Sequence, residues 1–65
     1  MKKDILEGQW KQMRGEAKAW WGKLTDDDYD QIKGKRENLR GKIQERYGIE
    51  REEAERQLKE WESKF

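Results

Sequence analysis

Residues 8–22 read GQWKQMRGEAKAWWG, and residues 34–48 read GKRENLRGKIQERYG. Each segment places three glycines seven residues apart, with an apolar residue and an arginine before the middle glycine. The second segment begins 26 residues after the first, and an aromatic residue, Trp21 or Tyr47, precedes the last glycine of each. This degenerate internal duplication predicts two similar helical units.

Apolar residues in and around the first unit lie three or four positions apart, which is the spacing of one helix face. They are Leu6, Trp10, Met13, Ala17, Trp20, Trp21 and Leu24. Gly22 follows the stripe and is expected to end the helix in the left-handed conformation that glycine adopts easily. The first helix should therefore run from residue 5 or 8 to residue 21.

Thr25 has the character of a helix N-cap, since its hydroxyl can accept a hydrogen bond from an amide two or three residues on. Three aspartates, Asp26 to Asp28, follow in the first turn, where the helix dipole favours negative charge. Tyr29 and Ile32 are the apolar positions of this second helix, expected over 26–33. The aspartates lack the spacing and the distal glutamate of an EF-hand loop, so we expect no metal site there.

The second unit predicts a third helix, with Leu39, Ile43 and Tyr47 spaced four residues apart on one face. Gly34 either separates this helix from the second or bends a continuous one. Gly48 should end it in the left-handed conformation, as Gly22 ends the first helix. Ile49 would then pack back on Ile43 or Gln44.

A fourth helix is expected over 50–63, with an apolar stripe of Ala54, Leu58, Trp61 and Phe65. Glu52–Arg56 and Glu55–Lys59 have the spacing of stabilising helical ion pairs. No proline interrupts the chain and no alternating strand pattern occurs. We therefore predict an all-α fold of four short helices forming a single domain over 1–65, with residues 1–4 loosely ordered.

Two glycines, Gly15 and Gly41, interrupt otherwise good helices, each at a cost of roughly 1 kcal/mol relative to alanine. Both lie nearly opposite the apolar stripe of their own helix. Three explanations remain open. The glycines let another helix or turn approach closely, they mark kinks or breaks, or they are exposed and the cost is tolerated because flexibility is useful.

The neighbouring Trp20 and Trp21 point about 100° apart on a helix, so one of them should be partly exposed. The exposed one either closes the edge of the domain or contacts a partner, since aromatic residues are enriched at interfaces.

Composition excludes several kinds of site. The 65 residues contain no cysteine and no histidine, which rules out disulfides and thiolate or imidazole metal sites. No glycine-rich phosphate loop occurs, and the remaining polar residues form no recognisable catalytic set. We expect no enzymatic activity and no cofactor.

The N-terminus lacks the apolar region of a signal peptide, and no apolar run could span a bilayer. The expected location is therefore the cytoplasm, without membrane association.

Nearly half of the residues are charged, yet the net charge is only +1. Residues 1–24 and 34–48 each carry +3, whereas residues 25–33 carry −3 and residues 49–65 carry −2. Either packed helices compensate one another, or the basic units form a face for an anionic partner. Candidate partner contacts are Arg14, Trp20, Arg40, Lys42 and Arg46; Lys18, Lys35 and Arg36 extend the set of possible phosphate contacts if that partner is a nucleic acid.

Several motifs together resemble the CsbD-like family of small bacterial general-stress proteins. They are Trp10-Lys11-Gln12, the run Trp21 to Asp28, Gly34-Lys35-Arg36, the run Gly41 to Gly48, and Ala54-Glu55. The resemblance covers nearly the whole chain, and the Gly41–Gly48 run GKIQERYG is its most specific part. Arg14 and Glu16 depart from a more basic context, and Trp20 duplicates an expected single tryptophan.

The resemblance implies a cytoplasmic, stress-induced bacterial protein. It also implies a compact bundle of four or five short helices, similar to the SAM-domain-like arrangement of two crossed helical hairpins. It carries over no catalytic or binding residues. Together with the hydrophilic composition, it predicts a monomeric, non-enzymatic stress-response protein that serves as a protectant. The alternative is a small interaction module that binds nucleic acid or a protein through the basic repeat helices.

Overall fold

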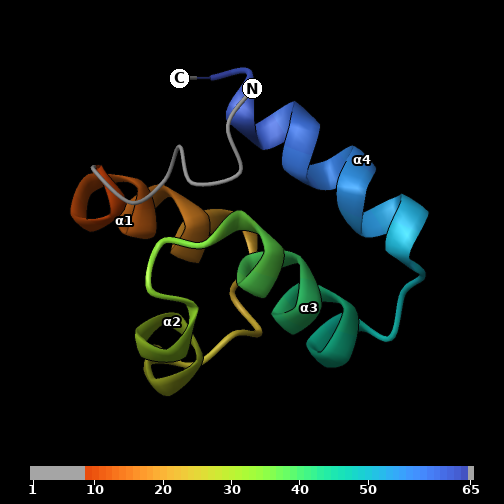
Figure 1. Cartoon of the computed structure of the whole chain (residues 1–65), viewed down its shortest axis with the longest axis horizontal. Coiled ribbons are helices and arrows are strands. Elements are labelled where there is room, and N and C mark those ends of the chain that lie inside the picture. Colours follow the sequence, from red (N-terminus) through yellow and green to blue (C-terminus); the bar gives the residue numbers. More distant parts are fainter. Residues whose placement is uncertain (1–8, 65) are drawn as a thin grey trace.

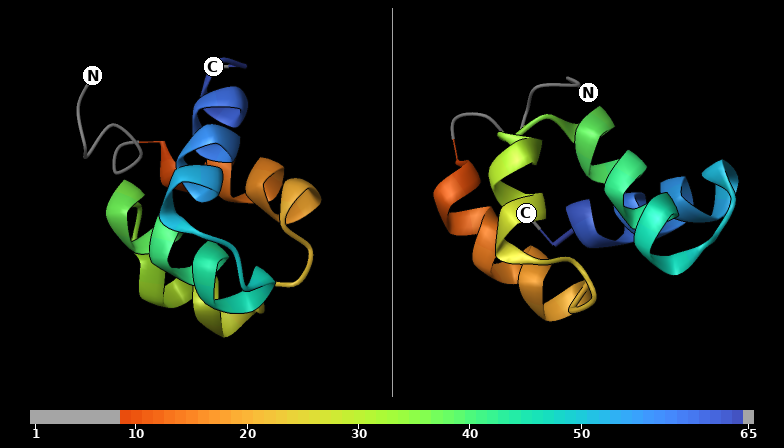
Figure 2. Two further views of the ribbon diagram at one scale, coloured as in Figure 1. Left: turned by 90° about the vertical axis from the view of Figure 1, so that its right-hand side faces the viewer. Right: turned by 90° about the horizontal axis from the view of Figure 1, so that it is seen from below.

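Four α-helices follow one another along the chain: α1 (Trp10–Trp20), α2 (Asp26–Ile32), α3 (Arg36–Tyr47) and α4 (Arg51–Glu62). The computed structural model describes residues 9–64, and these contain no strand. Helix α3 packs against both α2 and α4, as Figures 1 and 2 show. The all-α prediction is therefore confirmed. The expected loose order of residues 1–4, the earlier start of the first helix and the stripe position Phe65 lie outside the described residues.

Helix ends at glycine were predicted with mixed success. Gly48 has a φ of 63°, and its N–H donates to the Gln44 carbonyl at 2.9 Å, so it caps α3 as expected. Gly34 separates α2 from α3, with a φ of 78° after a φ of 55° at Lys33. Ile49 follows the Gly48 cap and packs against the buried core.

The prediction that Gly22 ends α1 in the left-handed conformation is wrong. Only Gly34 and Gly48 have a positive φ among the described glycines, and the C-cap of α1 is Trp21, with a φ of −121°. The physical reason lies in the turn after α1 and in Tyr29 of α2. The Tyr29 hydroxyl is 3.1 Å from the Ala17 carbonyl oxygen and 3.0 Å from that of Trp21. Both carbonyls also accept a backbone N–H, Ala17 from Trp21 at 2.8 Å and Trp21 from Leu24 at 3.1 Å. The single hydroxyl proton of Tyr29 adds a donor to one of them at a time, so the end of α1 closes without a glycine-based cap.

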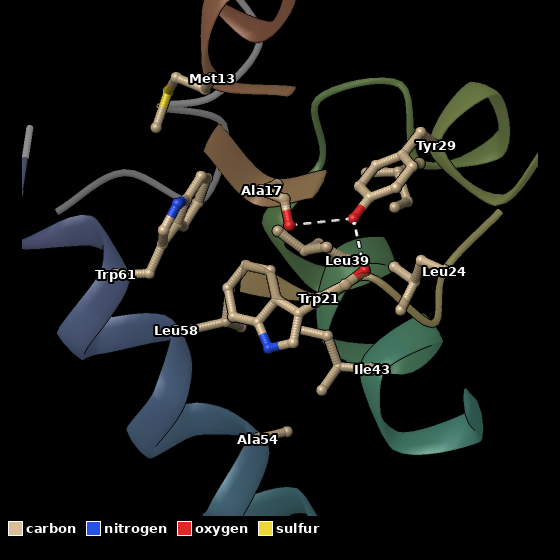
Figure 3. Close-up of a cluster of buried hydrophobic side chains, with 11 residues drawn as sticks. Met13, Ala17, Trp21, Leu24, Tyr29, Leu39, Ile43, Ala54, Leu58 and Trp61 are labelled. Atoms are coloured by element: carbon tan, nitrogen blue, oxygen red, sulfur yellow. Dashed lines mark hydrogen bonds between the residues drawn. The ribbon is translucent and has the colours of Figure 1, made fainter. Parts of the chain in front are cut away.

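The core gathers apolar side chains from all four helices and from the α1–α2 connection. Its buried members are Met13, Ala17, Trp21, Leu24, Tyr29, Ile32, Leu39, Ile43, Ala54, Leu58 and Trp61. The indole rings of Trp21 and Trp61 meet edge to face with centroids 5.3 Å apart, which joins the end of α1 to α4 (Figure 3). Trp21 Nε1 also donates to Gln57 Oε1 at 2.9 Å, so this indole has a polar partner on α4.

Gly15 and Gly41 are exposed within uninterrupted helices. A Cβ added at either position would meet no atom within 4 Å beyond the glycine's immediate surroundings in its own helix. No other described part of the molecule lies close to either glycine, and neither glycine breaks its helix. Of the three explanations, the one that holds is exposure.

The duplication extends into the tertiary structure. Met13 and Leu39 are equivalent and buried, and so are Ala17 and Ile43. The central arginines of the two units also make equivalent contacts with the next helix. Arg14 lies 5.8 Å from the centroid of the Tyr29 ring, and Arg40 pairs with Glu55 at 2.9 Å. Tyr29 and Glu55 are 26 residues apart, as are the two arginines. Each unit thus directs its central arginine at the same position of the helix that follows.

Candidate functional site

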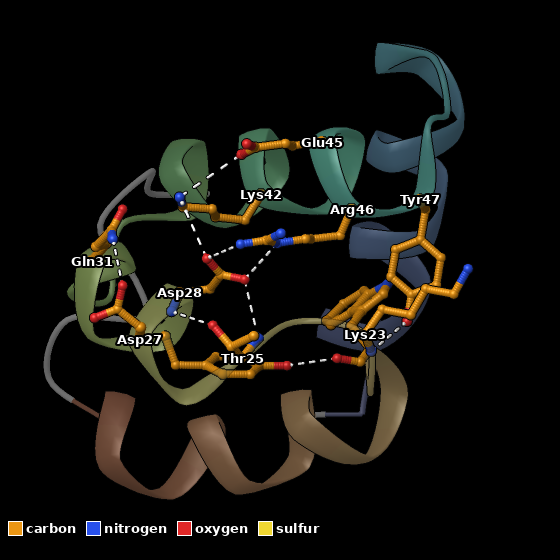
Figure 4. Close-up of polar contacts among 11 residues, drawn as sticks. Lys23, Thr25, Asp27, Asp28, Gln31, Lys42, Glu45, Arg46 and Tyr47 are labelled. Carbon is orange, nitrogen blue, oxygen red and sulfur yellow. Dashed lines mark hydrogen bonds and ion pairs between the residues drawn. The ribbon is translucent and has the colours of Figure 1, made fainter.

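Asp28 is the only charged residue in the buried set of the described chain, with 1 % of its surface exposed. Arg46 on α3 donates to both carboxylate oxygens, from Nε to Oδ2 at 2.8 Å and from Nη2 to Oδ1 at 3.0 Å. Lys42 Nζ lies 3.5 Å from Oδ1. Figure 4 shows both cationic side chains reaching from α3 toward α2. A buried carboxylate without such partners would be strongly destabilising, so this cluster fixes α2 on α3.

Thr25 completes the surroundings of Asp28. The Asp28 N–H donates to Thr25 Oγ1 at 3.1 Å, and the Thr25 N–H donates to Asp28 Oδ2 at 3.0 Å. This reciprocal pair is a capping box, and it confirms Thr25 as the N-cap of α2. The hydrogen bond from Arg46, followed by that from the Thr25 backbone, holds the pKa of Asp28 far below its usual range. Asp28 therefore stays ionised and cannot serve as a general acid at neutral pH.

Glu55 plays the corresponding part between α3 and α4. It accepts hydrogen bonds from Arg36 Nη1 and Nη2 at 3.1 and 2.9 Å, and from Arg40 Nη1 at 2.9 Å. Arg36 Nε also donates to Glu62 at 2.8 Å. The hydrogen bonds from Arg36 are the main reason that the pKa of Glu55 falls to about 2. This second cluster bridges α3 and α4.

Both ion pairs predicted within α4 are wrong. Glu55 faces Arg36 and Arg40 across the helix interface instead of Lys59. Arg56 pairs with Glu53 and, at 4.0 Å, with Glu60, rather than with Glu52. Sequence spacing identifies which side chains can meet along one helix, but a bidentate arginine on a neighbouring helix is a stronger partner for a carboxylate than an exposed lysine.

A third set of contacts joins α1 to α2. Arg14 Nη1 lies 2.9 Å from Asp30, and Arg14 Nη2 donates to the Asp26 carbonyl oxygen at 3.3 Å. Lys18 Nζ lies 2.7 Å from the Asp26 carboxylate. These pairs are more exposed than the Asp28 cluster, so each adds little stability by itself. They complete a pattern in which the basic repeat helices pair with neighbouring helices: α1 pairs with α2, and α3 pairs with both α2 and α4.

The five predicted partner contacts do not gather into one surface. Arg46 and Lys42 surround Asp28 on one side of α3, whereas Arg40 faces α4 and Arg14 faces α2. Trp20 is half-buried, with its ring centroid 5.6 Å from that of Trp21 and 5.5 Å from Lys64 Nζ. The buried member of the tryptophan pair is Trp21, which confirms that one of them is partly exposed. Partner contact by these five residues stays a prediction.

The shifted groups do not provide acid–base chemistry near neutral pH. Lowered carboxyl pKa values keep Asp28 and Glu55 ionised, and burial raises the pKa of Tyr29 to about 12. Between residues 9 and 64, no three acidic, histidine or cysteine side chains are grouped so that they could hold a metal ion. No helix in the same range has the length and apolar character needed to cross a membrane.

The paired basic helices and capped acidic helix come from the segments that carry the family motifs. Residues 4–56 match the family model described as CsbD-like. The chain belongs to the CsbD-like family. This match confirms the resemblance to the CsbD-like family that the sequence motifs indicated. The finer expectation of a SAM-domain-like arrangement is compatible with the four helices and stays a prediction.

Curated relatives of this CsbD-like chain carry names without a stated activity. A UPF0337 protein of Pectobacterium atrosepticum is 60% identical over 62 residues, which cover 95% of this chain and 90% of the relative. The UPF0337 protein YjbJ of Escherichia coli strain K12 is 53% identical over 64 residues, covering 98% of this chain and 93% of the relative. A UPF0337 protein of Bordetella pertussis is 51% identical over 61 residues, covering 94% and 92%. No solved structure matches the chain.

Sequence reasoning missed the two carboxylates that organise the CsbD-like fold. Asp28 was assigned to the helix dipole, although its place three residues after Thr25 is the signal of a reciprocal cap. Glu55 was assigned to a helical pair with Lys59. Its equivalence to Tyr29 in the duplication, opposite the equivalent arginine, is the signal that could have placed it against Arg40.

Proposed function

We propose that this CsbD-like protein is a non-enzymatic, hydrophilic protectant in the bacterial stress response, acting in the cytoplasm. The proposal rests on the pairing of charges within the chain. The basic side chains of the repeat helices meet carboxylates of the neighbouring helices. Nearly half of the residues are charged, yet the net charge is only +1, and many of these charges are paired within the chain. Such a surface is strongly hydrated but holds little attraction for one sign of ligand.

A protectant of this kind works without a binding site. Its charged groups retain water. Within residues 9–64, the large aromatic and aliphatic residues of the core are buried, and the half-buried Trp10, Trp20, Tyr47 and Ile49 pack against that core. The protein can therefore be present at high concentration between other proteins without associating strongly with exposed apolar surface. Separation of labile proteins from one another is the mechanism we infer.

Drying a labile enzyme with and without the protein tests this proposal. We expect less turbidity and more recovered activity than with an equal mass of an unrelated globular protein. The double variant Arg36→Gln/Arg46→Gln leaves Asp28 and Glu55 short of their main partners, so it should protect less at temperatures where its fold is lost. Equal aggregation with the wild-type protein and with the unrelated protein would sink the proposal.

A further inference from the structure

The two exposed glycines occupy equivalent positions of the duplicated units. Gly15 lies in the middle of α1, Gly41 lies in the middle of α3, and the positions are 26 residues apart. Alanine would fit at both without meeting a neighbour within 4 Å, and it would favour the helix. Packing inside the molecule therefore gives no reason for glycine at either position. A contact outside the molecule does, because a helix without a Cβ allows another backbone to come close.

The helix faces around these glycines differ in charge. Around Gly15, the exposed neighbours three or four positions away are Lys11, Gln12, Lys18 and Ala19. Around Gly41 they are Glu37, Asn38 and Glu45. We call these the Gly15 face and the Gly41 face. Among these neighbours, Lys18 pairs with Asp26 at 2.7 Å and Glu45 lies 3.8 Å from Lys42, so the charges left without an ion pair in the described chain are Lys11 on the first face and Glu37 on the second.

The Gly41 face also contains a shallow surface depression. It is lined by Gln31, Glu37, Asn38, Gly41, Lys42 and Glu45. Gln31 comes from α2, so the depression lies along the side of α3 that adjoins α2.

Lys11 and Glu37 show the difference between the two faces most clearly, because they occupy equivalent positions and have opposite charges. Both are exposed, and neither makes an ion pair with another residue in the described part of the chain. The neighbouring pair of equivalent positions, Glu16 and Lys42, is opposite in charge as well. Opposite signs at equivalent positions give the two faces electrostatic complementarity.

From this complementarity we propose that the Gly15 face of one molecule docks on the Gly41 face of a second copy. In an antiparallel crossing over the glycines, Lys11 lies opposite Glu45; in a parallel crossing it lies opposite Glu37. Both orientations join unlike charges. Because two different faces meet, the contact is heterologous, and it extends head to tail unless a ring closes.

The contact is one helix face against another, smaller than the interface of a stable dimer, so it is weak and reversible. The protein is then a monomer when dilute and assembles when concentrated. This self-association goes beyond the proposed protectant role and does not depend on it. Screening by salt should weaken it, since both faces are exposed to solvent.

A charge exchange between two variants tests the proposal. Sedimentation velocity is measured from dilute solution up to about 1 mM protein, the range in which weak contacts populate complexes. The wild-type sedimentation coefficient should rise with concentration. Lys11→Glu places a glutamate at this equivalent position of both faces, and Glu37→Lys places a lysine there on both. Each variant alone should therefore associate at least about threefold more weakly. Mixing the two variants in equal amounts should restore association.

Matched controls change the same charges elsewhere. Lys59→Glu lies in the last turn of α4, and Glu52→Lys lies in its first turn, as Glu37 lies in the first turn of α3. Both control residues are exposed and without an ion pair in the described chain. These variants should associate like the wild type. Equal weakening in controls and test variants would mean that net charge alone matters, which overturns the proposal.

A further variant separates docking from folding. Gly41→Gln places a neutral, helix-compatible side chain in the depression, so the melting temperature should rise while self-association weakens. Stabilisation with unchanged association would contradict the docked glycine. The proposal would also be overturned if the wild-type protein stayed monomeric at every concentration. The same holds if the two faces bound a different protein and not a second copy.

Discussion

Arg46 on α3 holds both carboxylate oxygens of Asp28 on α2, at 2.8 and 3.0 Å, although Asp28 is almost entirely buried. The same carboxylate closes the capping box with Thr25. One side chain therefore fixes the start of α2 and the packing of α2 on α3. Breaking a buried pair from one side leaves an unpaired charge, which is more destabilising than removing an exposed pair.

Asp28→Asn should lower the melting temperature by several degrees more than Asp27→Asn does. Both changes remove one negative charge from the first turn of α2, so their effects on the helix dipole are matched. Asp27 is exposed and accepts a hydrogen bond only from Gln31 within the described chain. Thermal unfolding followed by circular dichroism measures the difference, and equal melting temperatures would refute a central role for the Asp28–Arg46 pair.

Alanine at either exposed glycine should stabilise the fold. We expect Gly15→Ala and Gly41→Ala each to raise the free energy of unfolding by roughly 1 kcal/mol, which corresponds to roughly 4–8 °C in a domain of this size. Gly48→Ala is the contrasting variant, because the φ of 63° at Gly48 disfavours a side chain. It should lower stability. A loss of stability in Gly41→Ala would show that the position needs glycine for folding.

Acid should destabilise the protein through Glu55. Its pKa is about 2 in the folded protein against a usual value of 4.5. A carboxyl group with a lowered folded-state pKa contributes stability above its unfolded-state pKa, and this contribution is lost as pH falls toward the folded-state value. Asp28 acts in the same direction. The urea midpoint should therefore drop between about pH 5 and about pH 2, and Glu55→Gln should show a smaller drop over that range than the wild type.

Base should destabilise the protein through Tyr29, whose pKa rises from 10.0 to about 12 on burial. Because the folded state favours the protonated phenol, the stability it contributes is present below pH 10 and lost as pH rises toward 12. Tyr29→Phe removes this titration together with the hydrogen bond to the end of α1, at a cost of about 1 kcal/mol. Unfolding midpoints should thus fall less steeply with rising pH in the variant; parallel curves would argue against Tyr29.

Binding of nucleic acid distinguishes the two functions considered for this chain. If the charges serve a protectant, tryptophan fluorescence should not shift when single-stranded RNA or duplex DNA is added at low salt, because Arg14, Arg40 and Arg46 already donate to groups of their own chain. A salt-dependent shift that Arg40→Gln abolishes and Lys59→Gln preserves would support the interaction module instead.

The sequence was a good guide wherever the deciding interaction is local. The apolar spacing of Leu39 and Ile43, the cap at Thr25 and the left-handed Gly48 depend on neighbours within one or two helical turns, and all were predicted correctly. Gly22 was not, because the turn after α1 closes through the Leu24 N–H on the Trp21 carbonyl, with the Tyr29 hydroxyl of another helix beside that carbonyl. The local pattern at Gly22 and Gly48 is alike, and only the surroundings differ.

By itself, the sequence determined the family, the all-α class and the duplication, since helix periodicity and motif spacing depend only on the order of residues along the chain. Only the tertiary structure decided the use of the charges: Asp28 joins Arg46, Glu55 joins Arg36 and Arg40, and the middle glycines face solvent. Spacing tells which side of a helix a residue occupies. Which helix faces that side, and whether any does, depends on packing between segments far apart in the chain.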